Sequence, residues 1–268
     1  MGLRIRTNVA SQAVRKTLTS ADRVAGDSYE KLASGKRITK SADDAAGLGI
    51  AKKMEAEVRG YRMAQRNANA GISLVQVAEG GLNEATNIMT RMRELSIQAA
   101  SDTVGEKERG YLNLEYEQLL QEADRITKTT TFSGKELLTG NSDTGTMDFH
   151  VGAYGGEDNK ISFNADQTDA TVENLGISGT NIATKEDASE NLSKIDDAID
   201  TVSGFRANFG SIQSRLQSTI SNLDTMSVNT EAARSRIEDV DVAEETAKLA
   251  STNVMKQAGI STLSQANN

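Results

Sequence analysis

The sequence predicts a mainly α-helical fold: an elongated, coiled-coil-like helical rod with a small β-hairpin insert, in which the N- and C-terminal helices are paired. Three observations lead to this fold. The 268-residue chain contains no proline, so no residue removes a backbone donor from a long helix. Apolar residues recur at steps of three and four over most of the chain, and the period changes to two only between about 145 and 182. Finally, both ends carry apolar stripes made largely of small residues.

The first helix is predicted over residues 3–33, and Gly35 suits the left-handed position that follows a helix. Its apolar face consists of Ala10, Val14, Leu18, Ala21, Ala25, Tyr29 and Leu32. The last helix presents Val240, Ala243, Ala247, Ala250 and Val254. Neither narrow stripe can bury itself, so we expect both ends to pack against partners. The predicted self-assembly residues are Val14, Leu18, Leu32, Ala247 and Val254.

A second helix is predicted over about 44–100, with Ser41 and Asp43 as candidate N-caps. Its later half carries a heptad seam, typical of helices that lie nearly parallel in a bundle. The seam residues are Val75, Ala78, Leu82, Ala85, Met89 and Met92. A third helix should follow from Leu112 to Ile126 and fold back on the second. The β-branched and glycine-containing segment 129–134 should end it.

Alternation of apolar and polar residues predicts a β-hairpin, with Met147, Phe149 and Val151 on one strand and Ile161 and Phe163 on the other. The longest helix should then run from about 185 to 240. At 1.5 Å per residue, a helix of about 50 residues is about 75 Å long, so the pattern predicts a rod.

Composition excludes several classes of protein. The chain has no cysteine, and therefore no disulfide framework, thiolate metal site or thiol nucleophile. Its net charge is −8, with +6 over residues 1–40 and −10 over residues 141–200, which argues against nucleic-acid binding. No apolar run is long enough for a transmembrane span, and the N-terminus lacks a cleavable signal, so neither membrane insertion nor export by the general secretory route is expected.

No catalytic, cofactor-binding or metal site is predicted. His150 is the only histidine, which leaves no cluster for a metal or a nucleophile relay. The acidic pairs Asp43-Asp44 and Glu238-Asp239 lack the loop spacing of a calcium site, so capping and intersubunit salt bridges are expected of them. The Gly152–Gly156 region lacks the Lys-Ser/Thr of a phosphate-binding loop. The sequence therefore predicts a protein that is not an enzyme and has no cofactor.

Several short motifs, taken in order, resemble the terminal signatures of bacterial flagellins. The resemblance covers about residues 1–140 and 185–268, which is nearly everything outside the β insert. The motifs are Leu-Ala-Ser-Gly (32–35) with Arg37-Ile38, Asp-Asp-Ala-Ala-Gly (43–47), Arg-Asn-Ala-Asn-Ala-Gly-Ile-Ser (66–73), Glu79-Gly80, Leu-Asn-Glu (82–84), Arg-Glu-Leu (93–95) and Ala-Arg-Ser-Arg-Ile-Glu-Asp (233–239).

The resemblance implies a short flagellin without large outer domains. Residues 1–43 and 238–268 would form a terminal inner-core domain, and residues 44–237 a helical rod with its β element at about 140–184. The protein would be secreted unfolded through the flagellar type III apparatus and would polymerise with itself into the extracellular flagellar filament used for swimming. Implied partners are an export chaperone at the C-terminal region and the hook-associated junction and cap proteins.

Energetics predict that the terminal helices fold late. Ordering a residue costs about 1–2 kcal/mol, and a stripe rich in alanine buries too little area to offset that cost in one helix or one pair. We therefore expect the ends to be largely disordered in the free subunit and to fold when neighbouring subunits cover them.

The family resemblance carries three further implications. Flagellins detected by the innate immune receptor TLR5 present an Arg, a Leu and a Glu that correspond to Arg91, Leu95 and Glu115. Flagellins also usually continue past the Gln265 region through a short, more apolar tail, on which the filament lining and chaperone docking depend, whereas the sequence stops at Asn268. The alternative assignment is another axial component, such as a hook-filament junction protein, although the motifs at 66–69 and 235–239 favour flagellin.

Overall fold

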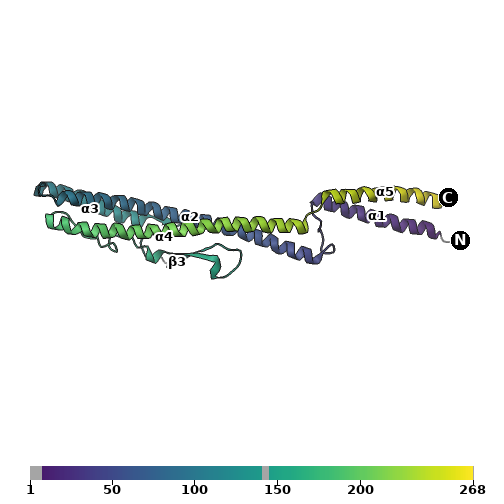
Figure 1. Cartoon of the computed structure of the whole chain (residues 1–268), viewed down its shortest axis with the longest axis horizontal. Coiled ribbons are helices and arrows are strands. Elements are labelled where there is room, and N and C mark those ends of the chain that lie inside the picture. Colours follow the sequence, from purple (N-terminus) through teal and green to yellow (C-terminus); the bar gives the residue numbers. More distant parts are fainter. Residues whose placement is uncertain (1–7, 141–144, 268) are drawn as a thin grey trace. The chain divides into compact units, whose positions relative to one another are not determined.

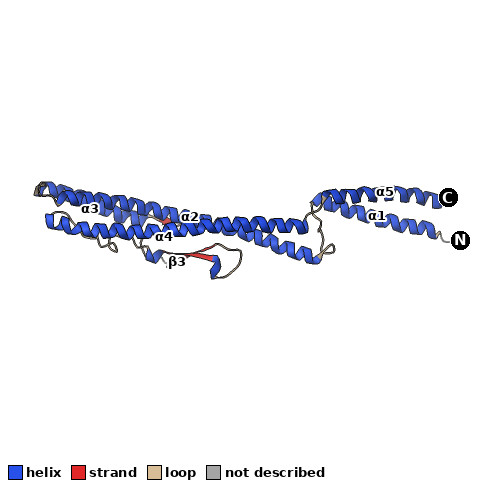
Figure 2. Cartoon of the chain, in the orientation of Figure 1, coloured by secondary structure: helices blue, strands red, loops and turns tan. Residues whose placement is uncertain are grey.

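The computed structural model describes residues 8–140 and 145–267. The chain divides into two compact units: unit 1 combines Met1–Arg59 with Ser227–Asn268, and unit 2 is Gly60–Met226. The predicted domain boundaries at 43/44 and 237/238 stay a prediction. Five α-helices lie in the described residues (Figures 1 and 2), namely α1 (Val9–Ser34), α2 (Ala45–Ala99), α3 (Glu106–Thr129), α4 (Lys185–Glu238) and α5 (Val242–Asn267).

The core of unit 2 is formed by α3 and by the parts of α2 and α4 that belong to this unit. The predicted heptad seam of α2 is confirmed, since every residue from Val75 to Met92 on it is almost fully buried. Tyr116 of α3 and a row of α4 residues complete the core. The α4 row consists of Ile195, Val202, Phe209, Ile212 and Leu216. The apolar residues that recur at steps of three and four in the sequence are thus the residues that face the core of unit 2.

The predicted β-hairpin is present as β3 (Thr146–His150) and β4 (Lys160–Asn164), which pair antiparallel. Met147 faces Phe163 in the register, and Phe149 faces Ile161. The Phe163 ring lies 5.3 Å from the Phe209 ring of α4, centroid to centroid, so the hairpin is joined to the helical core. Figure 2 shows these strands beside the helices.

A second, shorter hairpin joins α3 to the remainder of the insert. It pairs β1 (Thr131–Phe132) with β2 (Lys135–Glu136). The sequence pattern indicated the end of α3 here but not this hairpin. Two single-turn 3₁₀ helices, η1 (Glu157–Asn159) and η2 (Ala165–Gln167), flank β4.

In unit 1, α1 ends as predicted. Gly35 has φ 70° and ψ 11°, and its N–H donates to the Lys31 carbonyl. This left-handed conformation favours glycine because it has no Cβ. The part of the predicted first helix that precedes Asn8 lies outside the described residues, and the Asn8 side chain accepts a hydrogen bond from the Ser11 N–H.

The predicted caps of α2 were wrong. Asp44, rather than Ser41 or Asp43, accepts a hydrogen bond from the Gly47 N–H at 2.8 Å. Asp43 instead accepts from the backbone N–H groups of Thr39 and Lys40, which closes the preceding turn. Asp44 therefore caps α2 and Asp43 closes the turn before it, and the sequence alone did not show which aspartate has which role.

Replacing Phe209 tests the core of unit 2. Because Phe209 is fully buried against Phe163, Phe209→Ala should lower the free energy of unfolding by about 3–5 kcal/mol, measured by denaturant titration of the circular dichroism signal. Met63→Ala is the matched control, since Met63 is exposed on α2. Equal losses in the two variants would contradict this packing.

Candidate functional site

The first and last helices of the chain form a closely packed pair in unit 1. Figure 1 shows α1 and α5 side by side, and their Cα atoms approach within 8 Å repeatedly along the pair. The distance between packed helices depends on the size of the facing side chains, and small ones allow a close approach. The buried α1 residues at this contact are Ala21, Ala25 and Ser28, and the buried α5 residues are Glu245 and Thr252.

The inward face of α1 follows a heptad that differs from the predicted stripe at two positions. Ala10 and Tyr29 are exposed, and the inward positions are Ser11, Val14, Leu18, Ala21, Ala25, Ser28 and Leu32. Ser28, and not Tyr29, occupies the inward position. Steps that alternate between three and four keep residues on one helix face, whereas the predicted run placed two steps of four in succession and so moved away from that face. Val14, Leu18 and Leu32 are half-buried on this face.

The apolar stripe of α5 faces away from α1. The inward positions of α5 are Glu245, Leu249, Thr252, Lys256, Gly259 and Leu263. Ala243, Ala247, Ala250 and Val254 are all exposed, Val254 by 65%. Of the predicted self-assembly residues, Ala247 and Val254 therefore lie on an unpartnered surface of the subunit, which we call the outer face of α5.

Polar contacts explain why the more polar face of α5 turns inward. The Ser28 hydroxyl donates to Glu245 Oε1 at 2.5 Å, and Lys256 Nζ lies 2.7 Å from Asp22 Oδ1. A buried carboxylate needs such partners, because an unpaired charge is costly away from water. The Ser28 hydrogen bond, followed by Lys248, lowers the pKa of Glu245 below its ordinary value, although burial opposes this shift.

Unit 1 has few buried apolar residues and many exposed ones. Of the 37 buried hydrophobic residues in the described chain, five lie in unit 1: Ala21, Ala25, Ile38, Ala51 and Val58. Of the 15 exposed large hydrophobic residues, eight lie there: Val9, Tyr29, Ile50, Val228, Val242, Val254, Met255 and Ile260. Such an imbalance is typical of a surface that packs against other chains.

A groove runs between the two helices toward their far ends. Its volume is about 340 Å³, and it is lined by Ala13, Val14, Thr17, Leu18, Met255, Ala258, Gly259 and Thr262. A Cβ at Gly259 would lie 3.6 Å from Leu18 Cδ1, which is an ordinary van der Waals contact, so a methyl group would fit at this position. Small residues thus shape an apolar concave surface next to the outer face of α5.

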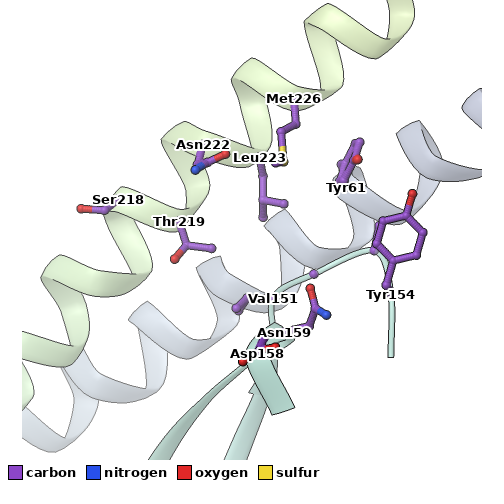
Figure 3. A pocket seen from close by; sticks show the side chains of 12 residues that line it. Tyr61, Val151, Tyr154, Asp158, Asn159, Ser218, Thr219, Asn222, Leu223 and Met226 are labelled. Atoms are coloured by element: carbon purple, nitrogen blue, oxygen red, sulfur yellow. The ribbon is translucent and has the colours of Figure 1, made fainter. Parts of the chain in front are cut away.

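Unit 2 contains a shallow pocket of about 420 Å³ between α2, α4 and the β3–β4 loop (Figure 3). Tyr61 and Tyr154 lie on one side of it, and Ser218, Thr219 and Asn222 project from α4. The lining residues include a single carboxylate, Asp158, and no histidine. The lining side chains provide hydrogen-bonding groups and apolar surface, but no pair of residues suited to general acid–base catalysis.

The three residues compared with receptor-binding flagellins do not share one exposed surface. Arg91 Nη2 and Nε donate to Glu115 Oε1 at 2.8 and 3.1 Å, and both residues are exposed. Leu95 is only 1% exposed and packs in the helical core of unit 2. The prediction of a contact surface is corrected at Leu95, because this residue lies on the buried side of α2.

The remaining candidate residues have structural neighbours. The His150 carbonyl accepts a hydrogen bond from the Asn67 side chain, and this contact holds β3 against α2. Glu238 is buried and pairs within its own subunit with Lys36. Within residues 8–140 and 145–267, no group of three or more acidic or histidine side chains is placed to hold a metal ion. Nor does any helix in those ranges have the length and apolar character needed to cross a membrane.

Comparison with known proteins identifies the family. The sequence models "Bacterial flagellin N-terminal helical region" and "Bacterial flagellin C-terminal helical region" match residues 5–143 and 192–268. The chain belongs to the bacterial flagellin family. It is 42% identical over 238 residues to a flagellin of Halalkalibacterium halodurans, covering 89% of this chain and 86% of that protein. It is also 35% identical over 277 residues to the flagellar filament 33 kDa core protein of Treponema phagedenis, covering 98% and 96%.

The structure has a flagellin neighbour as well. The crystal structure of Bacillus cereus flagellin superposes with a TM-score of 0.53 at 28% identity, covering 63% of this chain and 94% of that one. The protein is therefore a structural subunit of the flagellar filament, an extracellular appendage in which flagellins polymerise. Both flagellin models and these relatives favour this assignment over another axial component.

The motif at 66–73 has a physical role in this flagellin. Asn67 holds the β3 carbonyl of His150, and Gly71 lies under the Phe149 ring. A Cβ at Gly71 would lie 3.1 Å from Phe149 Cδ1 and 3.3 Å from Leu216 Cδ1, closer than side chains normally pack. The motif thus allows the hairpin to lie tightly on α2.

The lowered pKa of Glu245 predicts acid sensitivity of the α1–α5 pair. A carboxylate with a lowered pKa stabilises the pair above its ordinary pKa of about 4.5, and this stabilisation is lost as the pH falls through the lowered value. Glu245→Gln should reduce the protection of residues 242–256 relative to wild type at pH 7. The difference between the two proteins should shrink as the pH falls below about 4.5, because the wild-type carboxylate then becomes protonated. Hydrogen–deuterium exchange, corrected for the intrinsic rate at each pH, measures this protection.

Glu244→Gln is the matched control, since Glu244 is the neighbouring but exposed carboxylate. Identical pH profiles for wild type and Glu245→Gln would contradict the role of the buried carboxylate.

Proposed function

We propose that unit 1 carries the polymerisation surface of this flagellin, and that the outer face of α5 and the α1–α5 groove pack against the terminal helices of neighbouring subunits. The observation that supports this most is the imbalance in unit 1 between its five buried hydrophobic residues, three of them alanines, and its eight exposed large ones. Neighbouring subunits would remove that exposed apolar surface from water, at about 25 cal/mol per Å².

The same imbalance supports late folding of the terminal helices. Ordering each residue of α1 and α5 costs about 1–2 kcal/mol, and a contact built from Ala21, Ala25 and Ser28 returns little apolar burial. The ends would then fold fully only in the polymer. A head-to-tail contact that repeats without closing generates an open helical filament, as this role requires.

Unfolded ends also suit the export route. A chain without a stable terminal core can pass through the flagellar type III apparatus in an extended form, and an export chaperone would cover the exposed apolar residues of α5 before release. Junction and cap proteins of the hook-associated class would meet the terminal helices at the filament ends. In this proposal residues 1–43 and 238–268 act as the inner-core domain and residues 44–237 as the rod domain, and the protein has no enzymatic activity.

A charge on the outer face of α5 tests this proposal. Val254→Asp and Ala247→Asp should each raise the critical concentration for polymerisation by roughly tenfold or more, because burying an unpaired carboxylate costs several kcal/mol at each subunit contact. Sedimentation of seeded samples and electron microscopy measure the assembled fraction. Ser221→Asp is the control, since Ser221 is an exposed position of α4 that belongs to unit 2.

If Ser221→Asp and Val254→Asp assemble equally well, the outer face of α5 is not the contact surface. Wild-type protein that forms no filaments under any seeding condition would contradict the assembly proposal as a whole.

A second proposed role is recognition by the innate immune receptor TLR5 through Arg91 and Glu115, which form an exposed ion pair on α2 and α3. Arg91→Ala should reduce receptor signalling by roughly tenfold, as expected for the loss of an interface arginine. Arg125→Ala is the control, since Arg125 forms a similar exposed ion pair with Glu122 on α3. Undiminished signalling by Arg91→Ala would eliminate this role.

A further inference from the structure

Methionine supplies every sulfur atom of this chain, because the sequence has eight methionines and no cysteine. The methionines buried in unit 2 are Met89, Met92 and Met147. Three of the described methionines are exposed: Met63 by 52%, Met226 by 47% and Met255 by 53%. A thioether that water reaches is also open to small oxidants, so these three are the most accessible oxidation sites in the part of the chain that the structure describes.

Two of the exposed methionines lie in unit 2, away from the terminal helices. Arg66 Nη2 donates to Met63 Sδ at 3.1 Å, so a charged group lies against this sulfur. Met226 of α4 lines the shallow pocket of unit 2 together with Tyr61 and Asn222 (Figure 3). Neither methionine belongs to the surface that we assign to polymerisation.

Met255 has a different setting, on α5 at the edge of the α1–α5 groove. Val14 and Leu18 of α1 belong to the same groove lining. The adjacent Val254 is 65% exposed, and Ile260 of the same helix is 59% exposed. The Met255 sulfur therefore lies within the apolar surface that neighbouring subunits would cover in the filament.

The accessibility of Met255 in the free subunit does not depend on whether α5 has formed. In the α1–α5 pair about half of this side chain is in contact with water, and in an unfolded chain end it is at least as accessible. In the proposed filament, neighbouring subunits cover the groove and the sulfur at its edge. The reactivity of this sulfur should therefore change when the subunit assembles.

We propose that Met255 is an oxidation site of the free subunit, and that its oxidation by a peroxide weakens assembly. The sulfur lone pair attacks one oxygen of hydrogen peroxide, so that a sulfur–oxygen bond forms and the oxygen–oxygen bond breaks. The second oxygen leaves as water with both protons. Sulfur loses two electrons in this step, and the peroxide gains them.

The product explains the effect on assembly. Methionine sulfoxide is polar, and burying it beside Val14, Leu18 and Val254 without a hydrogen-bond partner opposes association. The modification would thus act on free subunits and spare those already in a filament. This inference rests on the proposed polymerisation function and names a chemical modification that would regulate it.

Peroxide treatment of the full-length protein tests the site. Free subunits and filaments are exposed to the same concentration of hydrogen peroxide, the peroxide is removed, and mass spectrometry of proteolytic peptides measures the sulfoxide at each methionine. Met255 should oxidise roughly tenfold or more slowly in filaments than in free subunits. Met89 and Met92 report the core of unit 2 and must stay unoxidised in both samples. Equal oxidation rates of Met255 in the two samples overturn the inference.

A second measurement links the oxidation to assembly. Peroxide should raise the critical concentration of the wild-type protein by roughly tenfold or more, measured by sedimentation of seeded samples. Met255→Leu removes the sulfur but keeps an apolar side chain, so its critical concentration should change little relative to its own untreated sample. Met63→Leu and Met226→Leu are the matched controls, since each removes one exposed sulfur from unit 2 and should leave the protein as sensitive as wild type. An equal loss of assembly in treated Met255→Leu and treated wild type contradicts the inference.

Met255→Gln separates this inference from the proposed function. Glutamine places a polar group where the sulfoxide would lie, so this variant should assemble poorly without any oxidant. If Val254→Asp blocks filaments while Met255→Gln and peroxide-treated wild type assemble normally, the outer face of α5 is supported and the Met255 inference is refuted. If Val254→Asp assembles normally while peroxide blocks wild type but not Met255→Leu, the Met255 inference is supported and the outer face of α5 is not the contact surface.

Discussion

The small side chains between α1 and α5 are the constraint on which the remainder of unit 1 depends. Alanine and serine at positions 21, 25 and 28 let the two backbones approach closely, but they supply almost no apolar area to bury. The pair is therefore specified by hydrogen bonds and ion pairs, such as Ser28 with Glu245, rather than by a hydrophobic core. Such contacts fix which residues meet while adding little net stability.

Unit 2 shows the opposite balance. Its helices bury large residues at regular intervals, and the hairpin adds Phe163 against Phe209. Because this core is complete within one chain, unit 2 can hold its structure without neighbours, whereas unit 1 leaves apolar residues exposed. The chain thus contains one unit with its own hydrophobic core, unit 2, and one unit whose exposed apolar residues are suited to form a core with other chains, unit 1.

Long apolar periods were the features that the sequence predicted best. The heptad of α2, the approximate bounds of α4 and the alternation of apolar residues in β3 and β4 all follow from periods that many residues share, so one exceptional position does not disturb them. Gly35 was also predicted correctly, because few residues adopt a positive φ. Individual positions were less predictable: Asp43 and Asp44 have the same chemistry, and only their backbone geometry decides which one caps α2.

The orientation of α5 is the most instructive difference. Hydrophobicity alone predicts that Ala247 and Val254 face the nearest helix, yet these residues are exposed while Glu245, Thr252 and Lys256 face α1. Choosing between the two faces requires knowing that Ser28 and Asp22 lie opposite, about 220 to 240 residues away in sequence, which no local pattern contains.

This arrangement has a physical logic for a polymerising chain. If the apolar face of α5 were buried against α1, the subunit would cover its own apolar surface and expose only polar residues on this helix. Association would then bury little further apolar area and gain little free energy. With polar contacts inside the α1–α5 pair and the apolar face of α5 outside, the apolar area is left for association to bury. In the proposed assembly, the intramolecular contact sets the register of the two helices and the intermolecular contact supplies most of the stabilisation, so the chain ends would fold fully only beside neighbouring subunits.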